Sequence, residues 1–208
     1  MPHHAPVRTD DLYQLPADLP VPVDDGAARH LIGTTLPPVA LPSTSGGSVR
    51  LDDAAGSLVV VYCYPRTGRA DAVALGSTAS WNAIPGARGC TPQSCAYRDH
   101  HRELQALGAV VYGLSTQPTD YQGEAVSRLH LPFQLLSDAA GEFSARLRLP
   151  WFEVEGVRLL KRVTLIIRQG RIAHCIYPVF PPDRDAETVI TWIRDHFLPG
   201  NRLQRTPR

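Results

Sequence analysis

The sequence predicts an α/β fold, a sheet covered by helices on both faces, and three observations carry this prediction. Apolar runs typical of buried strands alternate with segments whose apolar residues recur at helical spacing. Near the end of the chain, Gln169-Gly170 has the composition of a two-residue hairpin turn. An amphipathic helix over residues 185–198 follows that hairpin.

The predicted elements follow in chain order. A hairpin over 39–51 precedes a strand at 58–64, and a helix over 92–107 ends before Gly108. The remaining elements are a strand at 109–115, a helix at 120–130, a strand at 133–136, a helix at 139–147, and paired strands at 163–168 and 171–177.

The chain is organised as one domain with extended ends. Residues 1–35 are rich in Pro, Asp and Ala without periodicity and predict an arm lying over a domain at 36–200. Residues 201–208 form a basic tail.

Composition excludes several classes of function. Lys plus Arg number 21 against 20 for Asp plus Glu, so no overall field favours nucleic acid or an anionic membrane. No apolar run approaches the roughly 20 residues of a membrane span, and the N-terminus lacks the apolar core of a signal peptide. We therefore expect a cytoplasmic protein, in which close cysteines are catalytic, redox-sensing or metal-binding more often than structural.

Cys90 and Cys95 stand at the predicted start of a helix. A thiolate is the reactive form of cysteine, and the unpaired N–H groups of a helix N-terminus favour it. Gly89 permits close approach of the backbone, and Pro92 suits a first helical turn. Five residues of helix separate the two Cα atoms by roughly 8 to 9 Å, beyond the approximately 7 Å limit for a disulfide. If the pair oxidises, the start of the helix must unwind.

Other candidates have simpler interpretations. Cys63 and Cys175 lie in apparent strands, where core packing is the favoured explanation. His100 and His101 do not combine with the cysteine pair into a usual zinc-ligand spacing, so we expect no metal. Trp151 and Phe152 could either line a substrate pocket or join the core.

The segment Gly-Cys-Thr-Pro-Gln-Ser-Cys-Ala-Tyr-Arg-Asp at 89–99 resembles that of the Q-type peroxiredoxins, also called bacterioferritin comigratory proteins. The similarity extends over roughly 36–198 through Leu-Ser-Asp at 136–138 and Lys-Arg-Val-Thr-Leu-Ile at 161–166. The resemblance implies a thioredoxin-like fold with a central mixed sheet, and a peroxidase that needs no cofactor. It also implies that Cys90 is the peroxidatic cysteine, Cys95 the resolving cysteine and Arg162 the arginine that faces the peroxide.

The chain departs from the family pattern before Cys90. The family frame places a threonine three residues before the peroxidatic cysteine, but Ala87 occupies that position here. A Gly-rich insertion at 66–88 follows Pro65, and we expect Thr67 to supply the missing hydroxyl. Ser77, Thr78 and Ser80 are competing hydroxyls on the same segment.

Two functions fit these residues. The first is a peroxidase that reduces hydrogen peroxide and organic hydroperoxides, is recycled by a thioredoxin- or glutaredoxin-type reductant, and is a monomer or homodimer. The second is a non-catalytic redox sensor or binding protein switched by a Cys90–Cys95 disulfide. The cysteine pair together with Arg162 favours the first.

Overall fold

The computed structural model describes residues 11–53, 57–69 and 75–197, and its centre is a five-stranded mixed sheet. The strand order is β5 (Gln134–Ser137), β4 (Ala109–Ser115), β3 (Leu58–Cys63), β8 (Val163–Arg168) and β9 (Arg171–Ile176). Strands β3, β4 and β5 run parallel, whereas β8 is antiparallel to both β3 and β9. The predicted α/β fold with a central mixed sheet is confirmed.

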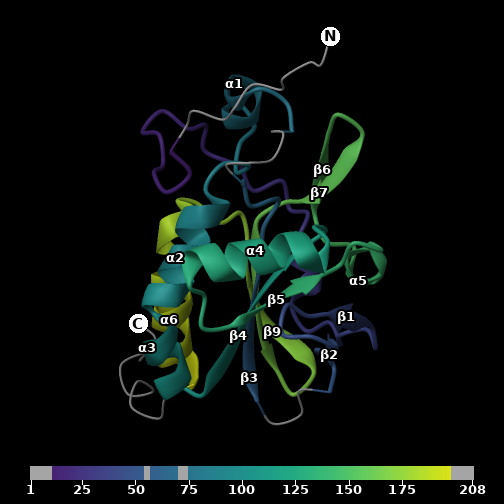
Figure 1. Cartoon of the computed structure of the whole chain (residues 1–208). Coiled ribbons are helices and arrows are strands. Elements are labelled where there is room, and N and C mark those ends of the chain that lie inside the picture. Colours follow the sequence, from purple (N-terminus) through teal and green to yellow (C-terminus); the bar gives the residue numbers. More distant parts are fainter. Residues whose placement is uncertain (1–10, 54–56, 70–74, 198–208) are drawn as a thin grey trace.

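Helices cover both faces of this sheet, as the alternation of elements predicts. Side chains such as Tyr62, Val111 and Ile166 form one core with the helices of the first face. Those helices are α2 (Cys90–Asp99), α3 (His101–Ala106), α4 (Thr119–Leu129) and α6 (Asp185–Phe197), of which α2, α3 and α6 stack side by side (Figure 1). The second face packs on α5 (Glu142–Leu147), the 3-10 turn η1 (Arg29–Leu31) and the hairpin of β1 (Ala40–Pro42) and β2 (Ser48–Arg50). Within the described ranges, no helix is long and apolar enough to cross a membrane.

A hairpin and a short helix were not predicted. A hairpin of β6 (Trp151–Val154) and β7 (Val157–Leu160) projects away from the sheet, and a short helix α1 (Thr78–Asn82) forms within the insertion (Figure 1). Glu155 and Gly156 have positive φ angles of 50° and 77°, the conformation of a tight hairpin turn. The hairpin supports the insertion, because the rings of Phe152 and Trp81 lie 6.2 Å apart in a small apolar cluster.

Several helix boundaries differ from those predicted. The helix expected at 92–107 begins at Cys90 and is divided at His100, whose φ and ψ of −94° and 6° end α2 before α3 begins. Apolar spacing could not reveal this break, since Tyr97 and Leu104 lie seven residues apart and face the same core with or without it. Helix α5 begins at Glu142 because both carboxylate oxygens of Asp138 accept backbone N–H groups of its first turn, at 3.0 and 2.8 Å.

Residues 11–35 lie against the domain. Backbone N–H groups of Gly33 and Leu36 donate to Ile172 and Gly170 at 2.8 and 2.9 Å, which covers the edge of β9. The Leu31 side chain is fully buried in the core of the second face. The first ten residues of the predicted arm and the predicted basic tail at 201–208 lie outside the described residues, as does position 198 of the last predicted helix.

Candidate active site

Cys90 is the first residue of α2 and is buried, with 4% of its surface exposed. The preceding Gly89 has a φ of +105°, and a Cβ there would overlap Pro182 and Leu15. Only glycine fits this left-handed and crowded position, so the backbone turns sharply into the helix. The Cys90 thiol therefore lies beside the unpaired N–H groups of the first turn.

Arg162 lies against Cys90. Its Nη2 atom is 3.3 Å from the Cys90 sulfur, and the same nitrogen donates to the carbonyl oxygens of Ala87 and Arg88 at 3.3 and 3.1 Å. Nη1 donates to the side-chain oxygen of Gln93. The arginine is 3% exposed, so a guanidinium charge lies buried beside the Cys90 sulfur.

A small cavity opens beside the Cys90 sulfur. Its walls include Arg66, Thr67, Trp81 and Tyr121, and its volume is about 30 Å³. Such a volume holds roughly two water molecules, which is about the size of hydrogen peroxide. The guanidinium of Arg66 stacks 5.2 Å from the centre of the Tyr121 ring at this wall.

Thr67 lines this cavity and is fully buried. Its hydroxyl and its backbone N–H both donate to the side-chain oxygen of Gln117, at 3.1 and 2.8 Å. The structure thus brings Thr67 to the same cavity as Cys90, with its hydroxyl hydrogen directed to Gln117. Of the competing hydroxyls, Ser77 and Thr78 also line the cavity, and Ser77 caps α1.

Cys95 lies on a different side of α2. It is half-buried and lines a surface hollow with Tyr13, Leu15 and Asp183. Burial raises the pKa of its thiol, an effect that the charge of Arg98 partly opposes. Both cysteines are free thiols and α2 is helical throughout, so the geometry is that of a reduced pair too far apart to bond.

Gln93 and Asp185 also belong to the site, and sequence reasoning missed both. The Gln93 side chain bonds Arg162 through its oxygen and Asp185 through its nitrogen, the latter at 2.8 Å. The spacing of Cys90 and Gln93, one helical turn apart, could have placed the glutamine at the site. Nothing in the sequence distinguishes Asp185 from an exposed acidic residue at a helix start.

The remaining candidates lie away from this cavity. Cys63 is buried in the core, as predicted; burial raises the pKa of its thiol well above its usual range and raises that of Cys175 to about 12. Phe152 joins an apolar cluster, whereas Trp151 is exposed beneath the guanidinium of Arg158.

The two histidines contact groups other than the cysteines. His100 contacts Glu103 at 3.0 Å, and His101 packs on Phe133. No group of three or more potential metal ligands lies together among the residues that the structure describes.

The arm closes over the loop that leads to Cys90. The Arg88 guanidinium donates to the backbone carbonyls of Asp11 and Gln14. Asp25 accepts hydrogen bonds from Lys161 Nζ at 2.7 Å and the Tyr177 hydroxyl at 2.8 Å. The Lys161 hydrogen bond is the main reason that the pKa of Asp25 falls to about 2.

A buried cysteine at a helix N-terminus beside a buried arginine, on a thioredoxin-like sheet, defines a thiol-based redox protein. The Redoxin family model matches residues 31–190. The chain is 28% identical to peroxiredoxin Bcp of Escherichia coli, over 79% of this chain and 96% of that one. It is 31% identical to peroxiredoxin bcp1 of Schizosaccharomyces pombe over 56% of this chain, and it spans about half the length of that relative.

Solved structures show the same fold. The crystal structure of peroxidoxin BcpB from Mycobacterium tuberculosis superposes with a TM-score of 0.62 at 24% identity, covering 79% of this chain and 97% of that one. The chain belongs to the Redoxin family and, within it, to the Q-type peroxiredoxins. The prediction of a thiol peroxidase is therefore confirmed, and a non-catalytic sensor is not favoured.

Replacing Asp25 with asparagine should lower the free energy of unfolding at neutral pH, but not at a pH near 2. A carboxylate whose folded-state pKa is depressed stabilises the fold above its unfolded pKa, near 3.8, and loses that contribution as the pH falls through about 2. Because the pair is exposed, the difference in unfolding free energy at pH 7 should be at most about 1 kcal/mol.

The pH dependence of this difference in unfolding free energy can be measured by urea unfolding. Asp25→Asn and the original protein are compared at several pH values between 7 and 2. The exposed arm variant Asp18→Asn serves as the control. A difference that persists unchanged at pH 2 would show that the carboxylate charge is not its source.

Proposed function

We propose that Cys90 is the peroxidatic cysteine, Cys95 the resolving cysteine and Arg162 the group that activates Cys90 and stabilises the transition state. The observation that carries this proposal is the 3.3 Å approach of Arg162 Nη2 to the Cys90 sulfur in a buried cavity. Peroxide reduction needs a cysteine nucleophile and donors for the developing oxygen charge, and the Cys90 sulfur beside Arg162 and the first turn of α2 is the candidate for both.

In the first step the Cys90 thiolate attacks one oxygen of the peroxide. A sulfur–oxygen bond forms, the O–O bond breaks, and the other oxygen leaves with the electron pair of that bond and the proton of the attacked hydroxyl, as water or an alcohol. Cys90 becomes a sulfenate, which takes a proton from solvent to give the sulfenic acid. Arg162 and the first-turn N–H groups of α2 stabilise the charge that moves from sulfur to oxygen.

In the second step the Cys95 sulfur attacks the Cys90 sulfur. A disulfide forms, the sulfur–oxygen bond breaks, and the hydroxyl leaves with the Cys95 proton as water. The start of α2 must unwind to bring the sulfurs together. Unwinding also exposes Cys95, which removes the burial that raises the pKa of its thiol.

A dithiol reductant of the thioredoxin or glutaredoxin type then restores both thiols, with two electrons passing to the disulfide. Such a donor operates in a reducing compartment, so we propose that the protein works in the cytoplasm. Either a monomer or a homodimer is compatible with a cysteine pair contained in one chain.

Hydrogen peroxide and small organic hydroperoxides are the proposed substrates. The cavity beside Cys90 has room for hydrogen peroxide. A related protein, the bacterioferritin comigratory protein of Xanthomonas campestris, has been studied for alkyl peroxide reduction.

Thr67 is proposed to accept a hydrogen bond from the peroxide. Because its hydroxyl hydrogen is donated to Gln117, its lone pairs are free to face the cavity that it shares with Cys90. This would replace the hydroxyl that Ala87 lacks.

Replacing each cysteine with serine tests the assignment of their roles. Cys90→Ser should abolish peroxide consumption with a thioredoxin system, because a serine hydroxyl is scarcely ionised. Cys95→Ser should react once and stop at a sulfenic acid that dimedone traps. The variants Cys63→Ser and Cys175→Ser should turn over normally, and full turnover by Cys90→Ser would move the nucleophile elsewhere.

Arg162→Lys should slow the reaction with peroxide by roughly tenfold to a hundredfold, because lysine keeps the charge but cannot contact sulfur, carbonyls and Gln93 at once. Stopped-flow measurement of the second-order rate constant tests this. Arg158→Lys, on the exposed β6–β7 hairpin, is the matched control. Equal rate constants for Arg162→Lys and the original protein would remove the arginine from the proposed mechanism.

Thr67→Val should lower the same rate constant by roughly tenfold, about the effect of losing one active-site hydrogen bond. Thr78→Val provides the comparison, since Thr78 lines the same cavity. If the Thr78 variant is slow and the Thr67 variant is normal, the hydroxyl comes from α1 instead.

A further inference from the structure

Asp185 is a buried carboxylate at the start of α6, with 2% of its surface exposed. Its Oδ2 atom accepts three hydrogen bonds: from the Gln93 amide at 2.8 Å, the Tyr97 hydroxyl at 2.9 Å and the Thr164 hydroxyl at 2.7 Å. Within the described part of the chain, its Oδ1 atom has no hydrogen-bond partner. Burying a carboxylate costs folding free energy, and burial raises the pKa of Asp185. The contacts of this carboxylate indicate its role.

One role concerns the arginine beside Cys90. Gln93 donates through its nitrogen to Asp185 and accepts through its oxygen from Arg162. A rotated amide would turn its NH₂ group toward the guanidinium and its oxygen toward the carboxylate, which opposes both contacts. Asp185 therefore fixes the amide in the orientation that holds Arg162 against the sulfur.

The second role concerns the helix that carries both cysteines. Gln93 and Tyr97 lie one turn apart on α2, and both bind Asp185 on α6. The segment between Cys90 and Cys95 cannot unwind while Gln93 remains bound. These two hydrogen bonds therefore stabilise the helical form of α2.

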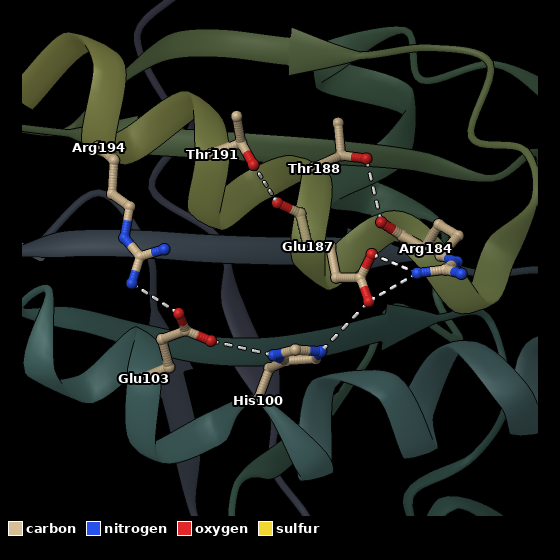
Figure 2. A network of polar contacts seen from close by, with 7 residues as sticks. All are labelled: His100, Glu103, Arg184, Glu187, Thr188, Thr191 and Arg194. Carbon is tan, nitrogen blue, oxygen red and sulfur yellow. Dashed lines mark hydrogen bonds and ion pairs between the residues drawn. The ribbon is translucent and has the colours of Figure 1, made fainter.

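The far end of α2 is held separately. Figure 2 shows Glu103 between His100 and Arg194, at 3.0 and 2.6 Å, and His100 reaching Glu187 at 3.8 Å. Glu187 in turn pairs with Arg184 at 2.7 Å. These contacts join the α2–α3 junction to α6, so we expect unwinding that starts at Cys90 to end at His100.

We infer that Asp185 is a positioning residue that acts on both steps: through Gln93 it aligns Arg162 for peroxide reduction, and through Gln93 and Tyr97 it delays disulfide formation. This inference rests on the proposed roles of Cys90 and Cys95.

The delay has a chemical consequence at Cys90. While α2 stays folded, the sulfenate remains beside the peroxide cavity, where a second peroxide can transfer one oxygen to sulfur and leave as water or an alcohol. The product is a sulfinate, which a thiol reductant does not reverse. The strength of the Asp185 contacts therefore sets how much peroxide the enzyme tolerates.

Two variants separate the roles. Tyr97→Phe removes one α2–α6 hydrogen bond without touching Gln93 or Arg162, and should speed disulfide formation roughly tenfold while leaving the peroxide rate constant unchanged. Asp185→Asn weakens both roles and should move the two rate constants in opposite directions, with slower oxidation and faster disulfide formation. Stopped-flow tryptophan fluorescence with hydrogen peroxide resolves the two phases.

Thr164→Val is the matched control, because it removes a donor to the same carboxylate oxygen from β8 rather than from α2. Disulfide formation in this variant should stay within about twofold of the original rate, the scatter of a substitution that touches no α2 contact. Intact mass provides an independent measure: Tyr97→Phe should need roughly tenfold more peroxide for the same sulfinate fraction.

Equal acceleration in Tyr97→Phe and Thr164→Val would indicate general loosening and overturn the inference. So would an Asp185→Asn protein in which both rate constants fall together. If the original protein forms no Cys90–Cys95 disulfide at all, peptide mapping reveals it and the proposed function itself fails. A normal disulfide with unaltered rates in all variants overturns the role of Asp185 alone.

Discussion

The Arg162 guanidinium and the Cys90 sulfur, 3.3 Å apart and both buried, form the contact on which the rest of the site depends. Because the buried guanidinium is poorly hydrated, protein acceptors must take the hydrogen bonds that water would otherwise accept. Two backbone carbonyls and the Gln93 oxygen supply it, and Asp185 orients that glutamine. The left-handed turn at Gly89 brings the cysteine to this charge at the start of a helix, where the N–H groups add to its effect.

This arrangement imposes a conflict on α2. The helix must be folded to hold Cys90 at the arginine, and it must be partly unfolded to let Cys95 reach Cys90. Contacts that improve the first step thus oppose the second. Those contacts come from Asp185 of α6 and from Arg162, which lie outside the segment that has to unwind, so the rest of the first face can stay packed while the helix changes.

Much of this architecture could be predicted from the sequence. Apolar runs identified the strands of the central sheet, and Gln169-Gly170 identified the β8–β9 turn, where both residues have positive φ angles. The juxtaposition of Cys90 and Arg162, 72 residues apart, was predicted only through the family resemblance, because strand alternation does not determine what a residue just before a strand contacts.

Other features left weaker signals. The Glu155-Gly156 turn lies between alternating apolar residues, a pattern that indicates the β6–β7 hairpin. The sequence carries no signal for the division at His100 or for the burial of Asp185, because both depend on how α2 and α6 pack together. Such tertiary contacts decide the energetics of the site, and a linear pattern does not contain them.

The most direct test of this account is amide hydrogen exchange of the reduced protein and of the protein oxidised by one equivalent of hydrogen peroxide. We expect a Cys90–Cys95 disulfide in the oxidised form, with exchange faster by at least about tenfold at residues 90–99 and unchanged in α3 and α6. A disulfide to Cys63 or Cys175, or an α2 that stays equally protected after the Cys90–Cys95 bond forms, would contradict it.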